Sequence, residues 1–395
     1  MTSTGFAQLL SGVFAGRVGG VLQGVAASVP TVLKYVLGLL LLVNIRSWPL
    51  IWHWHVFSPV VHYRLSVISL NIRTAFLSKQ KKLEAKDRFL QGLCPVGKDP
   101  IKFTINVGSW AGPDDCDFNM HLSNSSYPKH LDWARFRAAL HWGPTFFRAG
   151  GWIALGETHF KFLREIPMFS KFEMRMNLVA WDNKWLYLVV RYVTPKKVKS
   201  AKSRPITNGN AVTDKPVPSG DSAPFPSFHT PAQPSDLNSG SASGTTTPLP
   251  QGSGVNPAER IAQMVPTEEP DGATVHCIGV STQCFKIGRI TIPPSLVFTC
   301  EGFAGSPTDP SGKPYSIDNP PPHFSKAQEL QKPDLPKGHL KTFQKFLAGR
   351  WKEIPEGERW FENALGPDVE ERRRKNLEAI RGVTSGMQAA MSSML

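Results

Sequence analysis

The chain has 395 residues and a formal net charge of +14. Its 34 prolines and 33 glycines are spread unevenly, which indicates one compact part and one loose part. An excess of positive charge suits partners that carry phosphate, such as nucleic acid, an anionic membrane face or coenzyme A. Because no nucleic-acid-binding module is recognisable and the basic residues gather beside a hydrophobic segment and at the C-terminus, we expect membrane and cofactor contacts and no nucleic acid.

Cysteine usage argues against a metal site. The chain has five cysteines, with no CxxC pair and no metal-ligand spacing to histidine, so we expect no bound metal. Free thiols in a reducing compartment are the simplest interpretation. Cys116 lies inside the motif described below, where a nucleophilic role is the alternative to packing; no neighbouring base is evident, which favours packing.

An apolar stretch at residues 31–54 predicts a membrane segment. Between Val18 and Tyr63 the only basic residues are Lys34 and Arg46, and no acidic residue occurs. About twenty apolar residues suffice to span a bilayer, and three tryptophans fit an interfacial belt. A helix lying in the interface is an alternative, because Pro49 and several histidines interrupt the second half. A buried soluble helix is a third interpretation.

The flanking segments extend this prediction. We expect residues 1–30 to be flexible or membrane-associated and residues 55–100 to form a juxtamembrane helical region. The basic residues after the apolar stretch place the main domain in the cytosol by the positive-inside tendency. We therefore expect a membrane protein, single-pass or monotopic, with the endoplasmic reticulum as a candidate compartment.

Residues 101–194 read as the first part of a mixed α and β domain. A short strand is predicted at 101–107. After Ser125 an apolar stripe at helical spacing predicts a helix, with Asn124 or Ser125 as N-cap. Its members are Tyr127, Leu131, Ala134 and Ala138.

From Gly150 onward the hydrophobic period changes to two, which is typical of half-buried antiparallel strands. Turn-forming residues between Trp181 and Trp185 predict a hairpin, and a further strand is expected to run to Val193.

A Pro-, Ser-, Gly- and Thr-rich segment at residues 195–271 interrupts this domain. Its composition cannot bury enough apolar surface to offset ordering entropy, so we expect disorder. The β pattern resumes at residues 272–303, which we assign to the same domain because the chain beyond the insertion is too small for a separate core. Residues 304–395 read as a Pro-rich loop and a C-terminal helical tail, whose last helix is most simply a solvated one.

The segment DDCDFNMHLSNSSYPKHLDWARF, residues 114–136, resembles the signature of the hotdog-fold acyl-CoA thioesterases. In that signature an Asp-x-Asp pair precedes a His, an Asn, a Tyr and a helix. The resemblance is to the 4-hydroxybenzoyl-CoA thioesterase-like superfamily, and within it most to membrane-linked single-hotdog proteins and the fungal lcsJ-type thioesterase family. The resemblance implies an α+β single hotdog fold, an antiparallel sheet wrapped around a central helix, and homodimers that pair through their sheets with the active site at the interface.

Thioester hydrolysis needs a carboxylate as nucleophile or general base, and donors for the oxyanion such as the free N–H groups of a helix N-terminus. Asp117 precedes the predicted helix by a few residues and matches the family's catalytic position, so it is our candidate. A turn or capping role is its alternative. Asp115 is expected to orient the loop or form a salt bridge. His121 and Asn124 are candidates for polarising or orienting the substrate.

Three further residues are candidates for contacting substrate: Tyr127, and, towards the coenzyme A phosphates, Lys286 and Arg289. The alternative for Tyr127 is a structural role in the helix. The alternative for Lys286 and Arg289 is a solvated position at the end of a strand. Several aromatic residues would line an acyl channel or simply belong to the core, namely Trp110, Phe136, Trp142 and Trp152. No cofactor is expected beyond a coenzyme A or phosphopantetheine thioester as substrate.

Met120 departs from the resemblance, because many hotdog enzymes have glycine before the histidine. A side chain there would narrow the pocket or remove a tight turn. Three functions therefore stay open: a membrane-anchored acyl-CoA or acyl-carrier-protein thioesterase, with fungal lipid or polyketide metabolism implied by the resemblance; a non-catalytic hotdog protein that binds acyl chains or a partner; and a dehydratase on the same fold.

Overall fold

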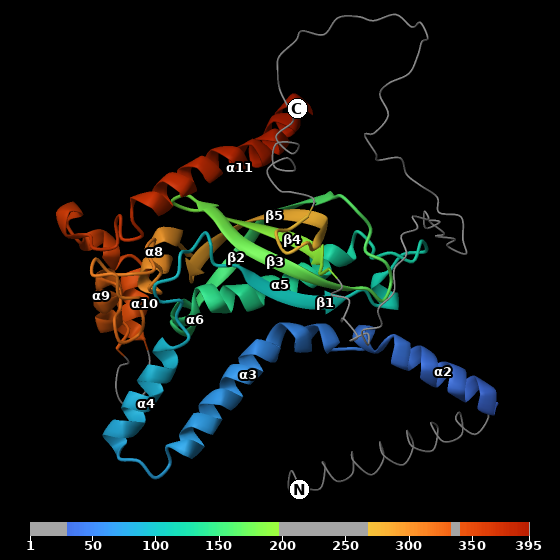
Figure 1. Ribbon diagram of the computed structural model, residues 1–395, viewed down its shortest axis with the longest axis horizontal. Helices are drawn as coiled ribbons and strands as arrows, with labels where there is room; N and C mark the ends of the chain where they lie inside the picture. Colours follow the sequence, from blue (N-terminus) through green and yellow to red (C-terminus); the bar gives the residue numbers. More distant parts are fainter. Residues whose placement is uncertain (1–29, 197–267, 333–339, 395) are drawn as a thin grey trace, which may run out of the picture.

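The computed structural model describes residues 30–196, 268–332 and 340–394. The described part combines helices with one antiparallel sheet, an arrangement consistent with a hotdog fold (Figure 1). Its strands are β1 (Ile105–Trp110), β2 (Gly151–Phe162), β3 (Lys171–Trp181), β4 (Leu186–Thr194), β5 (Thr274–Ile287) and β6 (Ile290–Ile292). Its central helix is α5 (Ser126–Trp142), followed by the short α6 (Pro144–Arg148).

The strand order is β1-β3-β4-β5-β2, with β6 paired to β5. β1 and β2 are therefore the edges, and β2 is the longer of the two. The predicted hairpin is confirmed: Asp182 accepts hydrogen bonds from the N–H groups of Lys184 and Trp185 and turns β3 into β4. The first strand begins at Ile105, later than predicted, because residues 101–102 form a turn and residues 103–104 have no regular structure.

The core lies between the sheet and α5. All four members of the predicted helical stripe are buried, and so are the alternating β3 side chains Phe172, Met174, Met176 and Leu178. The periodicities of 3.6 and 2 thus identified the two faces that meet. β2 shows no such clean alternation, since most of its side chains are only half-buried and its register shifts between Leu155 and Glu157.

The long insertion leaves and rejoins one sheet. Thr194 at the end of β4 pairs with Thr274 at the start of β5. Residues 195–273 therefore connect two adjacent strands. The disorder predicted for residues 195–271 concerns mostly residues 197–267, which lie outside the described part of the chain. The prediction for residues 1–30 likewise concerns almost only residues outside it.

The predicted membrane segment is divided in the structure. Residues 31–54 form α2 (Thr31–Val43), a 3₁₀ turn (Ile45–Ser47) and the start of α3 (Ile51–Arg73), which is followed by α4 (Lys79–Gln91). Leu50 interrupts the helices with a positive φ of 71°. Within the described residues, no helix combines the length and apolar character that crossing a bilayer requires. The expectation of one transmembrane helix over 31–54 is not met.

The C-terminal region packs on the domain more closely than its charge suggested. The described helices are α8 (Pro294–Cys300), α9 (Pro322–Leu330), α10 (Lys341–Leu347) and α11 (Pro367–Met394). Leu377 and Ile380 of α11 are buried against Ala180 and Tyr187 of the sheet, so this helix is not simply solvated. α11 covers the sheet face opposite α5, and α3 packs on the outer side of α5 (Figure 1).

Candidate active site

The motif loop between β1 and α5 is tied down at both ends. Cys116 and Leu122 form a bridge across it, and the Asp117 N–H donates to the His121 carbonyl at 2.9 Å. The loop is also bound to the β2–β3 connection, because the Leu122 N–H donates to Ile166 and the Met168 N–H donates to Met120. The loop therefore sits at the end of the sheet where β2 finishes.

Asp117 is part of the turn itself. Its Oδ1 accepts the N–H of Asn119 at 2.9 Å and that of His121 at 3.4 Å. Among the described residues no donor is hydrogen-bonded to Oδ2. Oδ1 of Asp117 therefore stabilises the turn, as the alternative role predicted, while Oδ2 is available to a substrate or water. Asp117 is half-buried and precedes the first residue of α5 by nine residues.

The N-terminus of α5 supplies donors next to this loop. The Ser126 N–H donates to the Ser123 carbonyl at 2.8 Å. The N–H groups of Ser125 and Tyr127 have no backbone acceptor in the described part of the chain, as is usual for a first helical turn. Ser125 is the N-cap residue, but its side chain makes no capping bond.

Met120 keeps the tight turn. Its φ is 64°, the left-handed conformation that glycine adopts without strain, and its side chain is 52% exposed. The expectation that a side chain here removes the turn is therefore wrong. Phe118 and Phe169 are also exposed beside it, which leaves apolar side chains around the candidate carboxylate.

His121 and Asn124 take different positions. His121 Nδ1 lies 3.2 Å from Glu165 Oε2, a contact whose geometry is too poor for a hydrogen bond. Asn124 is exposed and makes no hydrogen bond within the described residues. Only the backbone of His121 is joined to Asp117 here, so the supporting roles of both side chains stay predictions.

Asp115 does form salt bridges. Its buried carboxylate accepts from Lys129 Nζ at 2.7 Å and lies 3.1 Å from His130 Nε2. Burial would raise the pKa of Asp115, but the hydrogen bonds and charges of His130 and Lys129 outweigh it and hold the pKa at about 2. The other ring nitrogen of His130 is 3.1 Å from Ser109 Oγ. The three residues Ser109, His130 and Asp115 thus link β1, α5 and the motif loop.

The row Ser109, His130 and Asp115 contains the residue types of an acyl-transfer triad. Its geometry favours a structural role, because His130 is only 2% exposed and Ser109 Oγ also accepts from Arg46 at 3.2 Å. Sequence reasoning missed His130 and Ser109. The only available signal was the spacing of His130 behind Asp115, which has no meaning until the loop folds back on the helix.

The predicted substrate contacts are not brought together within one chain. Tyr127 is buried against Phe162 and Tyr192 in the core. Lys286 pairs with Trp152 at the far end of β2, and Arg289 is in the exposed turn beyond it. Phe162 pairs with Cys277, nine residues before Lys286, so the two ends of the sheet are about 30 Å apart.

The remaining candidates separate into core and surface. Trp142 is fully buried, whereas Trp152 is 45% exposed. Trp110 stacks on Phe169 beside the motif loop. Burial, together with the neighbouring aspartates, raises the pKa of Cys116 to about 11, which supports its packing role over a nucleophilic one. No group of His, Cys, Asp or Glu that could hold a metal occurs among the described residues.

Comparison with known proteins links this loop to a family. Residues 111–217 match the model of the Thioesterase-like superfamily. A probable thioesterase of Saccharomyces cerevisiae is 29% identical over 101 residues, which cover 23% of this chain and 41% of that protein. Protein THEM6 of Xenopus laevis is 32% identical over 109 residues, covering 26% of this chain and 50% of that protein.

Thioesterase lcsJ of Purpureocillium lilacinum is 25% identical over 218 residues, which cover 45% of this chain and 67% of that protein. The chain thus spans about half or less of the length of the yeast and frog relatives. The matched family segment contains the motif loop, α5 and the strands β2 to β4. The resemblance to the thioesterase-like superfamily that the motif indicated is therefore confirmed over residues 111–217.

Proposed function

We propose that this protein hydrolyses an acyl thioester of coenzyme A or of an acyl carrier protein. The observation that carries the proposal is Asp117, whose carboxylate is held in a tight turn of the loop that leads into α5, nine residues before the helix begins. The family match over the same segment and the thioesterase names of several relatives support it. A polyketide or fatty acyl donor, as implied by the fungal resemblance, is the finer part of this proposal.

In this mechanism Asp117 Oδ2 takes the proton of the attacking water or attacks the thioester carbon itself. The carbonyl oxygen gains negative charge as the tetrahedral intermediate forms. The free N–H groups of the first turn of α5 stabilise that charge, aided by the helix dipole. Collapse of the intermediate breaks the C–S bond. If water attacks, the proton taken by Asp117 passes to the departing thiolate. If Asp117 attacks, an acyl–carboxylate anhydride forms, and a water then cleaves it, adding its oxygen to the acyl group and supplying the proton of the free thiol.

We further propose that the site is completed by a second protomer across β2. This edge strand is uncovered in the described chain and carries exposed Trp152, Leu155 and Phe162. Edges of this kind invite pairing with another strand. If two β2 strands pair antiparallel, the Lys286 and Arg289 end of one protomer meets the Asp117 end of the other.

The hydrolase proposal is tested with purified protein and a panel of acyl-CoA thioesters, with free thiol as the readout. Asp117→Asn should lower kcat by about a hundredfold or more, because general base or nucleophilic catalysis contributes on that order. Ser109→Ala is the matched control and should retain most activity. Equal, slow thiol release by wild type and Asp117→Asn contradicts the proposal. Loss of activity only in Ser109→Ala would instead identify Ser109, which lies beside His130 and Asp115, as the nucleophile.

The dimer is tested by subunit mixing. Asp117→Asn and the double variant Lys286→Gln/Arg289→Gln should each be impaired as homodimers. Mixed dimers would contain one site with both wild-type contributions, so co-refolded mixtures should be more active than either parent. Activity equal to the average of the parents contradicts sharing between protomers.

Membrane attachment is proposed through α2 and the turn after it. Val32, Tyr35, Leu42 and Leu50 are each more than half exposed, an unusual amount of apolar surface for a helix in water. Flotation of the full chain with anionic lipid vesicles should be lost in a Leu39→Glu/Leu42→Glu variant. Unchanged flotation of that variant contradicts attachment through α2.

The alternative is a non-catalytic protein that binds acyl chains. It is favoured by Met120, whose side chain stands where a close approach of backbone to thioester is expected. Binding of acyl-CoA without thiol release by the wild type would establish it. Hydration of an enoyl-CoA by the same preparation would instead support the dehydratase.

A further inference from the structure

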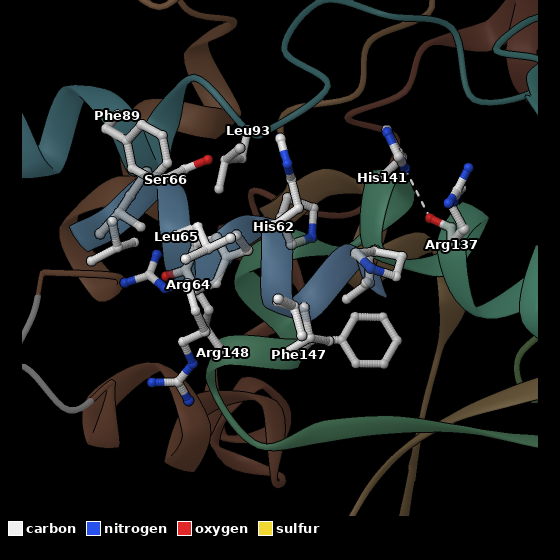
Figure 2. Close-up of a pocket in the computed structure, with 18 of the residues that line it drawn as sticks. His62, Arg64, Leu65, Ser66, Phe89, Leu93, Arg137, His141, Phe147 and Arg148 are labelled. Atoms are coloured by element: carbon white, nitrogen blue, oxygen red, sulfur yellow. Dashed lines mark hydrogen bonds between the residues drawn. The ribbon is translucent and has the colours of Figure 1, made fainter. Parts of the chain in front are cut away.

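A large pocket lies away from the motif loop. It has a volume of about 2140 Å³ and is formed by α3, α4, the C-terminal half of α5 and α6 (Figure 2). None of the predicted site residues Asp117, His121 or Asn124 lines it, and neither do Tyr127, Lys286 and Arg289. The pocket is thus separate from the proposed reaction centre.

The pocket exists because two helices diverge from the domain. Near its start α3 packs on α5, with His55 stacked on Trp133 at 5.5 Å and Phe57 against Phe136. Further along, α3 runs away from the domain, and α4 returns towards it as the second arm of a V (Figure 1). The space between the V and the domain is the pocket.

Apolar side chains line this space without being covered by protein. Leu65 is 59% exposed and Leu93 is 38% exposed, and Phe89 and Phe147 are half-buried. Small-molecule sites are mostly apolar, with a few polar groups that fix orientation. A flexible hydrocarbon chain is the ligand type that would cover this lining.

The charged lining is strongly basic. Five Lys or Arg and two acidic residues line the pocket, an excess of three positive charges. The acidic ones, Glu84 and Asp87, accept hydrogen bonds from Gln80 and Gln91 on their own helix. No salt bridge involving the basic lining residues occurs in the described part of the chain. They are Arg64, Lys86, Arg137, Arg148 and Lys332.

The basic groups come from separate elements around the same apolar lining. Figure 2 shows Arg64 on α3, Arg137 on α5 and Arg148 on α6, with Leu65 and Phe147 among the side chains between these elements. Guanidinium groups suit carboxylate and phosphate oxygens through paired hydrogen bonds. A hydrocarbon lining together with guanidinium groups that form no salt bridge describes a receptor for an anionic amphiphile.

We propose that this pocket binds one long-chain fatty acid, with its chain along Leu65 and Phe147 and its carboxylate held by Arg148. This site goes beyond the proposed function, because it requires no chemistry and uses none of the residues of the motif loop. It also differs from the proposed membrane contact, which is made by α2.

The experiment measures binding of palmitate to the full chain below its critical micelle concentration, by isothermal titration calorimetry. Hexadecanol has the same chain without the charge, and butyrate has the charge without the chain. We expect one palmitate per chain, at least tenfold weaker binding of hexadecanol, and no measurable binding of butyrate.

Two pairs of variants locate the site. Leu65→Glu should abolish palmitate binding, whereas Ile68→Glu, on the same helix but outside the pocket and also exposed, should leave it unchanged. Arg148→Gln should weaken palmitate binding at least tenfold and leave hexadecanol binding unchanged. Arg73→Gln is the charge control outside the pocket.

Several results overturn the proposal: no palmitate binding, several palmitates per chain, equal effects of Leu65→Glu and Ile68→Glu, or equal loss of palmitate and hexadecanol binding in Arg148→Gln. Binding of lysophosphatidate but not palmitate also overturns it, by assigning the site to phospholipid. Asp117→Asn should bind palmitate like the wild type. Failure of the hydrolase proposal would therefore leave this result unaffected.

Discussion

At the scale of single residues, Met120 shows a conflict between sequence and conformation. Its left-handed backbone costs about 1–2 kcal/mol for a residue with a Cβ, and its half-exposed side chain gains little burial in return. The turn is imposed by its neighbours, since the Met120 N–H donates to the Asp117 carbonyl and the Met120 carbonyl accepts from Met168.

Replacing this residue with glycine should therefore stabilise the fold. Met120→Gly relieves the strain but gives the unfolded chain more freedom, so the expected net gain in the free energy of unfolding is about 0.5 kcal/mol. Met120→Ala keeps the Cβ and serves as control, with no gain expected. Urea denaturation measures both, and a Met120→Gly protein less stable than Met120→Ala contradicts this explanation.

Asp115 gives a prediction on pH. Its folded pKa of about 2 lies below the usual value of 3.8, so its ion pairs contribute stability above pH 4 that is lost as the pH falls towards 2. The shift corresponds to about 2 kcal/mol. Asp115→Asn should cost at least that much at pH 7, and the difference from wild type should shrink below pH 4, as followed by urea denaturation at each pH. A pH-independent difference would contradict the assignment.

At the scale of elements, α6 depends on one residue distant in sequence. The fully buried Glu301 accepts the N–H groups of Thr145 at 3.2 Å and Phe146 at 2.6 Å, at the start of this short helix. Burial raises the pKa of Glu301 to about 7, against the opposing effect of these hydrogen bonds. The carboxyl group thus fixes the corner between α5 and β2, while its burial favours the protonated form.

Glu301→Ala should leave both N–H groups unpaired and lower the free energy of unfolding by about 2–4 kcal/mol. Because the folded pKa is raised from 4.5, the contribution of Glu301 is complete below pH 4.5 and declines as the pH rises through 7. The loss measured by urea denaturation should therefore be larger at pH 5 than at pH 8. The reverse order would show that the carboxylate is the preferred buried form.

At the scale of the whole molecule, the long insertion connects strands that are already neighbours. Thr194 and Thr274 pair directly, so their Cα atoms are only about 5 Å apart. The last residues of the insertion belong to the fold, because Glu269 lies 3.2 Å from Arg191 and Asp271 lies 2.6 Å from Arg175.

Replacing residues 198–266 with a short Gly/Ser linker should therefore leave the melting temperature and any thioesterase activity unchanged or slightly higher, since a shorter loop costs less closure entropy. A deletion extended to residue 272 removes both acidic partners and should lower the melting temperature. Loss of the folded domain in the shorter deletion would show that the segment belongs to the core.

The sequence by itself determined the features that depend on local pattern. The apolar stripe from Tyr127 to Ala138 indicated α5, the alternation from Phe172 to Leu178 indicated β3, and the residues at Trp181–Trp185 indicated the hairpin, because periodicity and turn chemistry act over a few residues. The motif around Asp117 and its family resemblance were likewise readable.

Only the tertiary structure decided which distant residues meet. Lys286 lies at the far end of the sheet from Asp117, His130 closes on Asp115, and the charged α11 packs on the sheet. The pocket between α3 and α6 also depends on where two helices diverge. Such contacts arise from the packing of whole elements, and neither hydrophobic period nor residue type encodes the distance between two segments far apart in the chain.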